Sequence, residues 1–255
     1  MKTLYIGDIH GRSVWKLIVE MEKPDKVIFV GDYFDSFNIS GIEQMRNFED
    51  IIEYKKSGQA EVIMLIGNHD YHYFPEVGYQ AYSGYQSGLA LSIGHLLNKN
   101  REHLQMAYMH DTILCTHAGV SSKFMDNVYG KDGWMILDIA DKLNETWKYK
   151  PRTFDFGAMI NSKGFTYIDS YGDNEEQCPI WIRPKSLMRV NKETLRKFVI
   201  QIHGHTETRS LDIKGAASGG RYYNIDCLET SGEYLIREDG KFTTKSWKSD
   251  KQLVS

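Results

Sequence analysis

Acidic, amide and imidazole side chains follow three successive apolar runs near the start of the chain. Asp8 and His10 follow the first run, in the motif Gly-Asp-Ile-His-Gly. The second run is followed by Gly-Asp-Tyr-Phe-Asp at 31–35, and the third by Gly-Asn-His-Asp at 67–70. Carboxylate and amide oxygens, together with imidazole nitrogens, suit Mn, Fe, Zn and similar ions. These residue types therefore predict a metal centre without thiolate ligands.

Two later motifs, Thr-His-Ala-Gly at 116–119 and Gly-His-Thr at 204–206, add further imidazoles. Asp8 and His10 could hold one ion from a single turn, and the carboxylate of Asp32 could bridge that ion to a second. The second ion would take three remaining donors, namely Asn68, His117 and His205. Two ions about 3.5–4 Å apart would bind the attacking and leaving oxygens of a phosphoryl group and acidify a bridging water. The chemistry that this set predicts is cleavage of phosphate esters.

The elements that must position these side chains alternate between strand and helix. Residues 2–6, 26–30 and 61–66 are apolar strand patterns, and residues 12–23 and 42–56 have the spacing of amphipathic helices. This order predicts a parallel sheet that is covered by helices. Ligands of open α/β sheets gather at the carboxyl ends of the strands, so the polar motifs should converge on one edge.

The later part of the chain is richer in strand patterns that end at turns. We expect strands at 103–109, 112–116, 199–202, 211–213, 222–225 and 233–237. Residues 131–178 are irregular and are expected to form a helical or loop insertion. No internal repeat or low-complexity linker interrupts the chain, so a single domain over residues 1–255 is expected.

Composition limits the classes of protein that the chain can belong to. Of its 255 residues, 41% are hydrophobic and 25% are charged, which is ordinary for a soluble globular protein. A net charge of -3 without a long basic run gives no strong signal for nucleic-acid binding. No apolar segment is long enough to span a membrane, so a cytoplasmic location is expected. The three cysteines are expected to be reduced thiols: Cys115, Cys178 and Cys227.

Five motifs together resemble the signature of the calcineurin-like metallophosphoesterases. They lie at 7–11, 31–35, 67–70, 117–119 and 204–206. The nearest branch resembles the phosphoprotein phosphatases and the bacterial diadenosine tetraphosphate hydrolases. The resemblance implies a four-layer α/β/β/α sandwich with mixed sheets. It also implies two divalent metal ions, with Mn favoured in vitro and Fe, Zn, Ni or Mg as alternatives.

The resemblance implies a role for each candidate residue. It repeats the metal assignments given above for Asp8, His10, Asp32, Asn68, His117 and His205. His69 resembles the general acid that protonates the leaving oxygen, and Asp35 resembles the carboxylate that orients this histidine. Hydrolysis would proceed by direct attack of a hydroxide that bridges the two metals.

Arginines bear on the substrate because a guanidinium can bind a phosphate with two parallel hydrogen bonds. The phosphatase branch has an arginine where this chain has Ser36, and its second phosphate-binding arginine resembles Arg183. Arg12, beside the first motif, is expected to be a solvated residue of the first helical turn.

Two substrate classes are considered, and we expect the first, with the second as the alternative. Hydrolysis of phosphomonoesters, as by a serine/threonine protein phosphatase, is favoured by the motif at 31–35. The alternative is a nucleotide hydrolase that acts on dinucleoside polyphosphates or cyclic phosphodiesters, which Ser36 and Asp70 favour. A binding module that has lost catalysis is disfavoured, because every ligand position is filled.

Aromatic residues cluster just after the third motif. They are Tyr71, Tyr73, Phe74, Tyr79, Tyr82 and Tyr85. One interpretation is a wall of the active-site cleft that stacks on a base or on a phosphotyrosine ring. The other is packing beneath a loop or at a subunit contact. The sequence leaves both open.

Overall fold

The first of two mixed sheets carries the amino-terminal motifs. The computed structural model of the protein describes residues 1–77, 82–160, 166–168, 174–190, 200–215 and 221–250. The strand order of this sheet is β13-β12-β1-β2-β3-β4, in which β1 to β4 are parallel and β12 and β13 are antiparallel. The strands are β1 (Lys2–Ile6), β2 (Lys26–Phe29), β3 (Glu61–Leu65), β4 (Leu104–Gln105), β12 (Glu233–Glu238) and β13 (Lys241–Ser246).

The second sheet has the order β10-β11-β9-β6-β5. Its strands are β5 (Ala107–His110), β6 (Ile113–Thr116), β9 (Ile200–His203), β10 (Asp212–Gly215) and β11 (Arg221–Asn224). The three central strands are parallel and the two outer strands are antiparallel. The single strand predicted at 103–109 was wrong, because the chain changes sheet at Met106. The residues before Met106 pair with β3, and the residues after it pair with β6.

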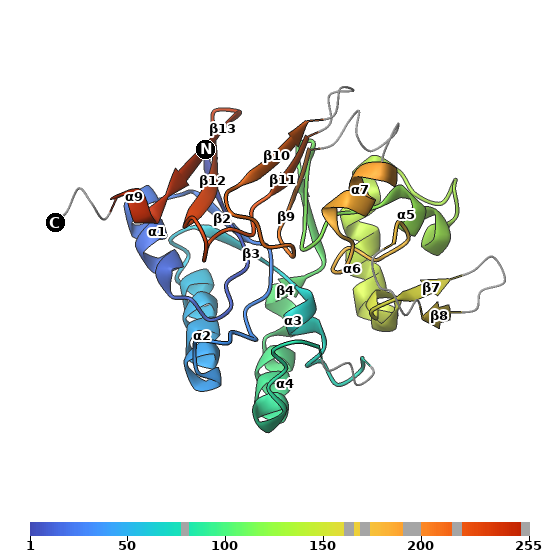
Figure 1. Cartoon of the computed structure of the whole chain (residues 1–255), viewed down its shortest axis with the longest axis horizontal. Helices are drawn as coiled ribbons and strands as arrows, with labels where there is room; N and C mark the ends of the chain where they lie inside the picture. The colour runs from blue at the N-terminus through green and yellow to red at the C-terminus, as the bar shows by residue number, and fades with distance from the viewer. Residues whose placement is uncertain (78–81, 161–165, 169–173, 191–199, 216–220, 251–255) are drawn as a thin grey trace.

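Helices cover both outer faces of the sheets, so the expected α/β fold with four layers and mixed sheets is confirmed. Figure 1 shows α1 and α2 on one side, α5, α6 and α7 on the other, and the strands between them. The helices are α1 (Val14–Glu22), α2 (Gly41–Ser57), α3 (Asn68–Tyr71), α4 (Ala90–Lys99), α5 (Ser122–Tyr129), α6 (Ile139–Tyr149), α7 (Pro184–Val190) and α9 (Trp247–Asp250). Short 3₁₀ turns lie at Ser87–Leu89, Arg101–His103, Ile136–Asp138 and Pro151–Phe154.

Alternation along the strands fills two different cores. Leu4 and Ile6 of β1 pack in the cluster that includes the helices, while Tyr5 packs in the cluster between the sheets. Tyr5 meets residues of both sheets there, including Ile28 of β2 and Ile202 of β9. Because successive side chains of a strand point to opposite faces, β1 is buried on both sides. The two sheets are thus held face to face, with their carboxyl edges side by side.

Helix α2 begins at a capping box and ends at a glycine. The Ser40 side chain accepts a hydrogen bond from the backbone of Glu43, and the Glu43 side chain accepts one from the backbone of Ser40. Gly58 ends the helix in the left-handed conformation that glycine adopts without strain. The cap at Ser40 fixes the end of the loop between β2 and α2, which carries part of the candidate site.

The region expected as a helical or loop insertion contains α6 and two short strands that were not predicted. Strands β7 (Ala158–Ile160) and β8 (Thr166–Ile168) pair antiparallel, while 161–165 and 169–173 lie outside the described residues. Cys115, Cys178 and Cys227 are buried and unpaired. Among the described residues, no helix combines the length and the apolar character that crossing a membrane requires.

Candidate active site

Five strand ends from both sheets bring the candidate ligands together. The first three motifs follow β1, β2 and β3, and the last two follow β6 and β9 of the other sheet. The candidate metal ligands are buried or nearly so: Asp8, His10, Asp32, Asn68, His117 and His205. Because the two carboxyl edges adjoin, residues far apart in the sequence meet here. The strand order predicted this convergence for the first three motifs only.

Each of the three candidate histidines binds a backbone carbonyl through one ring nitrogen. A carbonyl oxygen can only accept, so that ring nitrogen must carry the proton. The contacts are His10 Nδ1 to Phe34 O at 2.5 Å, His117 Nδ1 to Val30 O at 2.9 Å, and His205 Nε2 to Trp181 O at 3.1 Å. Burial lowers the pKa of His10 and of His205, so these two imidazoles are neutral and their other ring nitrogens present lone pairs to the site, as metal ligands must. For His117, burial is outweighed by the charge of Asp32, which raises the pKa of this imidazole.

The inner ring nitrogens of two histidines lie against one amide oxygen. His117 Nε2 lies 2.8 Å and His205 Nδ1 lies 2.9 Å from the same atom, Asn68 Oδ1. His117 Nε2 also lies 3.3 Å from Asp32 Oδ2. The lone pair of His205 Nδ1 faces this amide oxygen, which is unfavourable unless a cation lies between them. The donor set thus fits a divalent metal ion.

The carboxylates of Asp8 and Asp32 form a second group of ligands with His10. One ligand atom from each of the three lies within 4.8 Å of the others. Burial, and then the charges of Asp226 and Asp32, raise the pKa of Asp8 well above its ordinary value. Burial lowers the pKa of His10, which favours a neutral imidazole at this position. A divalent cation would relieve the repulsion between the buried carboxylates, so these residues also fit a metal ion.

The backbone of the site is strained at the residues that carry its chemistry. His10, Asp32, Asp35 and His205 have φ values of 41°, 54°, 67° and 71°, in the left-handed region that most residues avoid. Such strain persists only where surrounding contacts impose it, and it clusters at functional sites. Gly204 belongs to the same close packing, because a Cβ atom there would collide with a carboxylate oxygen of Asp8.

Asp70 holds two of the ligand-bearing loops together. Its carboxylate accepts hydrogen bonds from the backbone nitrogens of Asp32 at 2.8 Å, Tyr33 at 2.7 Å and Gly67 at 2.9 Å. This side chain is fully buried, and each of these donors lies at the end of β2 or β3. The last residue of the Gly-Asn-His-Asp motif therefore braces the loops.

His69 and Asp35 form the pair expected from the sequence. His69 Nδ1 lies 2.8 Å from Asp35 Oδ2, and the backbone nitrogen of His69 donates to Asp32 at 2.9 Å. Asp35 also accepts from Tyr73 Oη at 2.5 Å, and His72 Nε2 lies 2.7 Å from it. Burial tends to lower the pKa of His69, but the charges of Asp32 and Asp35 outweigh burial and raise it to about 9. The imidazole can thus carry a proton at neutral pH.

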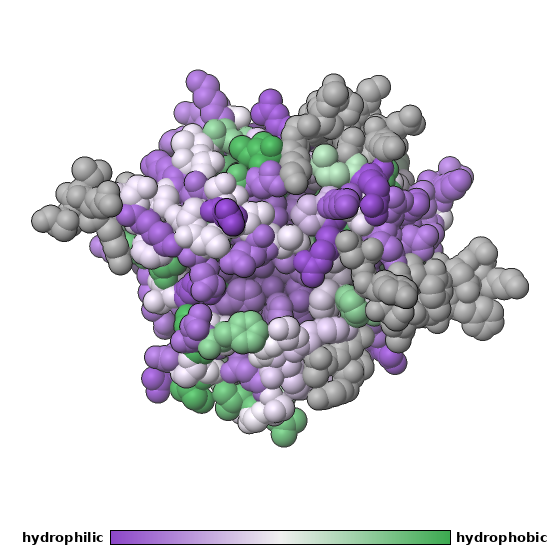
Figure 2. Space-filling model, in the orientation of Figure 1, coloured by the Kyte–Doolittle hydropathy of each residue, from purple (hydrophilic) through white to green (hydrophobic). Residues whose placement is uncertain are grey.

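These side chains open onto one cavity of about 350 Å³. Figure 2 shows a hydrophilic hollow near the middle of the visible face. The cavity wall includes Asp8, His10, Asp32, Asp35, His69 and His205, while Asn68 and His117 lie buried behind it. A space of this size admits a small phosphorylated group beside the candidate ligands.

Comparison with known protein families gives the same assignment as the motifs. The family model described as calcineurin-like phosphoesterase matches residues 1–209, which is most of the chain. This chain belongs to the calcineurin-like phosphoesterase family. It is accordingly a phosphoester hydrolase, and the candidate metal groups described above lie within the matched region. Among curated proteins, none matches the sequence.

Solved structures share the fold of this calcineurin-like phosphoesterase. A cold-active protein-tyrosine phosphatase from a psychrophilic Shewanella species has a TM-score of 0.64 and 15% identity, over 95% of this chain and 77% of that one. A protein serine/threonine phosphatase from Saccharomyces cerevisiae has a TM-score of 0.52 and 13% identity, over 96% and 79% of the two chains. At these identities the likeness shows the fold and leaves the substrate open.

Two arginines line the cavity of this calcineurin-like phosphoesterase. Arg183 is exposed, and its Nη1 lies 3.5 Å from Thr206 Oγ1. Arg12 precedes α1 and is mostly buried, so the prediction of a solvated residue in the first helical turn was wrong. Its guanidinium forms an ion pair with Glu229 and donates to the carbonyl of Ile9 at 3.3 Å. Both guanidiniums are therefore placed where a phosphate could reach them.

Sequence reasoning missed several residues of the cavity wall, namely Phe37, Glu207, Asp226 and Glu229. Asp226 follows β11, which runs parallel to β9, so the rule used for the other strand ends would have found it. Burial and the charge of Asp32 raise the pKa of Asp226 to about 7. Glu207 and Glu229 lie in loops, where no periodic pattern marks them.

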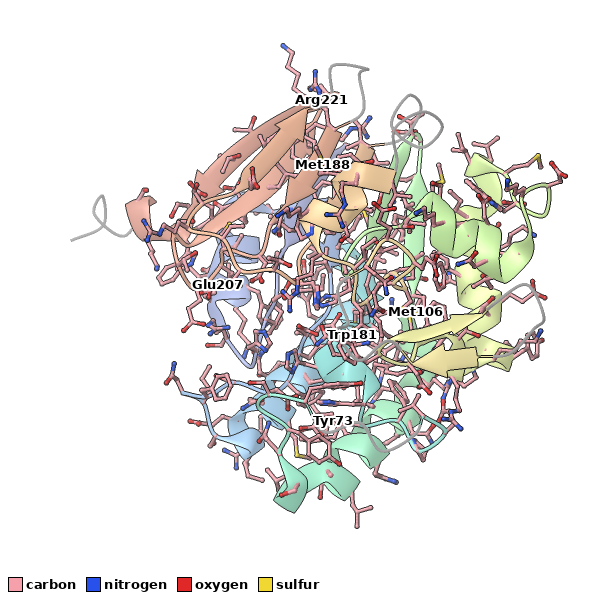
Figure 3. All side chains as sticks on the ribbon, turned by 45° about the vertical axis from the view of Figure 1, so that its right-hand side comes forward. Tyr73, Met106, Trp181, Met188, Glu207 and Arg221 are labelled. Atoms are coloured by element: carbon pink, nitrogen blue, oxygen red, sulfur yellow. The ribbon has the colours of Figure 1, made fainter. Side chains whose placement is uncertain are left out.

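The aromatic cluster after the third motif packs inside the protein. Tyr71, Tyr73 and Phe74 are buried, and the described members of the cluster are absent from the cavity wall. Figure 3 shows Tyr73 below Trp181, which lies near the centre of the view. The ring centroids of Tyr82 and Trp181 lie 4.5 Å apart. Tyr79 lies outside the described residues. Packing beneath a loop is thus the interpretation that the described aromatics support.

Proposed function

We propose that the protein hydrolyses phosphomonoesters with the help of two divalent metal ions. Asp8 and His10 would hold one ion, and Asp32 would bridge to the other. The second ion would take Asn68, His117 and His205. When bound, the ions would neutralise phosphate oxygens and acidify a water for attack on phosphorus. Mn is the ion that we propose for full activity in vitro.

The protein's own groups would supply proton transfer and binding. His69 would hold a proton at the ring nitrogen opposite its Asp35 contact and give it to the departing alkoxide. Asp35 would keep the ring in that orientation, since it binds Nδ1 at 2.8 Å. Arg183 and Arg12 would bind phosphate oxygens from the cavity wall, and Arg12 would take over from the arginine that Ser36 replaces.

One observation carries this proposal. Imidazole nitrogens, an amide oxygen and two carboxylates converge at a cavity whose wall also contains a histidine held by a carboxylate. The ring protons of His10 and His205 are bound to backbone carbonyls, which leaves their inner nitrogens available to a metal ion. The arrangement supports metal binding and acid catalysis at one place.

The charges of the cavity wall favour a substrate with a single phosphate group. Glu207, Asp226 and Glu229 add three carboxylates to the wall, while Arg12 and Arg183 add two guanidiniums. Glu229 already pairs with Arg12. A dinucleoside polyphosphate would bring several further negative charges against these carboxylates, which costs free energy in a partly buried site. A phosphomonoester with a neutral leaving group avoids this repulsion.

The test is a panel of substrates assayed with added Mn. It contains p-nitrophenyl phosphate, bis-p-nitrophenyl phosphate, phosphopeptides and diadenosine tetraphosphate. We expect turnover of the monoesters that is abolished by chelation and restored by Mn. A higher kcat/KM on diadenosine tetraphosphate or on the diester than on every monoester would overturn the proposal in favour of a nucleotide or diester hydrolase. We further propose that residues 1–255 form one domain and that the enzyme acts in the cytoplasm.

A further inference from the structure

Phe37 differs from its neighbours in the cavity wall. Among the residues that the structure describes, it is the one lining side chain that is built of carbon alone. The residue is 78% exposed, although aromatic residues of this size are usually buried. The rest of the wall is polar or charged apart from the buried, small Cys227. A single apolar surface is therefore presented to whatever enters the cavity.

The loop around Phe37 is held by hydrogen bonds on both sides. Gln44 of α2 accepts from the backbone of Ser36 at 3.3 Å and donates to the carbonyl of Ile39 at 2.6 Å. The backbone of Asn38 donates to Ser36 Oγ at 3.2 Å. The helix cap that follows at Ser40 fixes the far end of the loop. Because the backbone is braced, the ring is displayed on the surface at little further cost in conformational entropy when a ligand binds.

Phe37 lines the same cavity as His69 and Asp35 and is close to Asp35 along the chain. It follows Asp35 by two residues, and Asp35 holds His69. A general acid must lie next to the leaving oxygen, so the wall that contains His69 and Asp35 faces the departing group. Arg183 and Arg12 belong to other loops of the cavity wall. Phe37 therefore belongs to the same loop as a residue of the pair that faces the departing group.

We propose that Phe37 is a specificity residue that stacks on an aromatic ring in the leaving group of the substrate. This inference rests on the proposed phosphomonoesterase activity and narrows its substrate class. An aromatic ring pairs with another ring in offset or edge-to-face geometry, and such pairs are favourable beyond the area they bury. A ring also adds no charge near the carboxylates of Glu207 and Glu229. The ring is either bound directly to the ester oxygen, as in phosphotyrosine, or carried one sugar away, as in a nucleoside monophosphate.

The experiment compares Phe37→Ser and Phe37→Leu with the wild-type enzyme under saturating Mn. Each is assayed on a phosphotyrosine peptide, on the same peptide with phosphoserine, and on adenosine monophosphate. Leu91→Ser is the matched control, because Leu91 is 91% exposed on α4 and lies outside the cavity wall. Comparing each variant with the wild type on the same substrate removes the difference in leaving-group reactivity.

We expect Phe37→Ser to lower kcat/KM about 3- to 10-fold on at least one aromatic substrate and to leave the phosphoserine peptide unchanged. Phe37→Leu should show most of that loss, since it keeps the apolar surface but removes the ring. The aromatic substrate with the larger loss of kcat/KM shows whether the substrate's ring is bound directly to the ester oxygen or carried one sugar away. Equal losses on all substrates, no loss, or the same loss in Leu91→Ser would overturn the inference. A wild-type enzyme that hydrolyses no phosphomonoester would instead contradict the proposed function itself.

Discussion

The floor of the cavity, formed by the candidate metal ligands with His69, Asp35 and Asp70, differs from the rim in how its side chains are held. On the floor, imidazoles are fixed by backbone carbonyls, Asp70 ties two loops together, and four residues have left-handed backbone. The rim consists of Arg12, Phe37, Arg183, Glu207 and Glu229, whose side chains extend from loops. Apart from Arg12 these rim residues are exposed. The floor therefore has one geometry, while the rim can vary without disturbing it.

This difference suggests how chemistry and selectivity are divided. Changes on the floor should impair the reaction with every substrate, because they remove metal ions or the acid. Changes on the rim should alter affinity for some substrates and leave the chemical step almost intact. If floor and rim variants changed activity in the same way, this division would be wrong.

The largest effect is expected for Asp32→Asn. A neutral amide is a poor bridge between two cations, so both ions should be lost and activity should fall more than about 100-fold on all substrates. Metal content after dialysis, measured by elemental analysis, checks the cause. Asp50→Asn on the exposed face of α2 serves as the control and should keep its metal. Retention of two metal equivalents by Asp32→Asn would exclude the bridging role.

His69→Asn should have the next largest effect, without loss of metal. General acids of this kind contribute roughly 10²–10⁴-fold to rate. The loss should be greatest for alkyl phosphates and much smaller for p-nitrophenyl phosphate, whose leaving group needs little protonation. Turnover across substrates with graded leaving-group pKa, with metal content in parallel, tests this, and exposed His95→Asn is the control. A uniform loss would remove His69 from the acid role.

Arg12→Gln should have a moderate effect that is confined to substrate binding. Because its guanidinium lines the cavity, its loss should raise KM about 10-fold and change kcat little. Glu229→Gln should lower KM, since it frees Arg12 from its ion pair. Steady-state kinetics on one monoester checks both, with exposed Arg46→Gln as the control. A fall in kcat with unchanged KM would place Arg12 in the chemical step instead.

The smallest effect concerns His110, far from the cavity on β5. Burial, and then the charges of Lys26 and Arg237, lower the pKa of His110 to about 4, below its ordinary value of 6.5. The unfolded chain therefore binds this proton first, and stability should fall as pH drops from about 6.5 towards 4. In His110→Gln the fall in the free energy of unfolding should be about 1–2 kcal/mol smaller, with allowance for partial exposure of the side chain. Urea unfolding at pH 7 and pH 5 measures it, and an unchanged pH dependence would contradict the assignment.

The sequence predicted the floor far better than the rim. The strand patterns that end at Asp8, Asp32 and Asn68 are strong because the strands are buried on both faces, so the strand ends were easy to locate. The face-to-face placement of His117 and His205 from the second sheet depended on the family resemblance. No periodic pattern marks Phe37 or Glu207, since their places depend on how loops fold over the edge.

Local signals also failed where pairing partners decide the structure. The run at 103–109 has uniform strand character, yet it divides at Met106 between two sheets, which only the tertiary arrangement determines. Strand β13 was not predicted, because its mostly exposed residues alternate only weakly. The contacts of Arg12 were missed for a related reason, as its partner Glu229 is distant in sequence.

The central claim is that this floor binds two divalent ions, and metal stoichiometry tests it most directly. The metal-free protein would be loaded with Mn, passed through a desalting column, and analysed for metal per chain, with calorimetric titration in parallel. Two equivalents are predicted for the wild-type protein, and one for His205→Ala, which removes a donor from the proposed second site only. Binding of fewer than two equivalents by the wild-type protein, or of two by Asp32→Asn, would contradict the account.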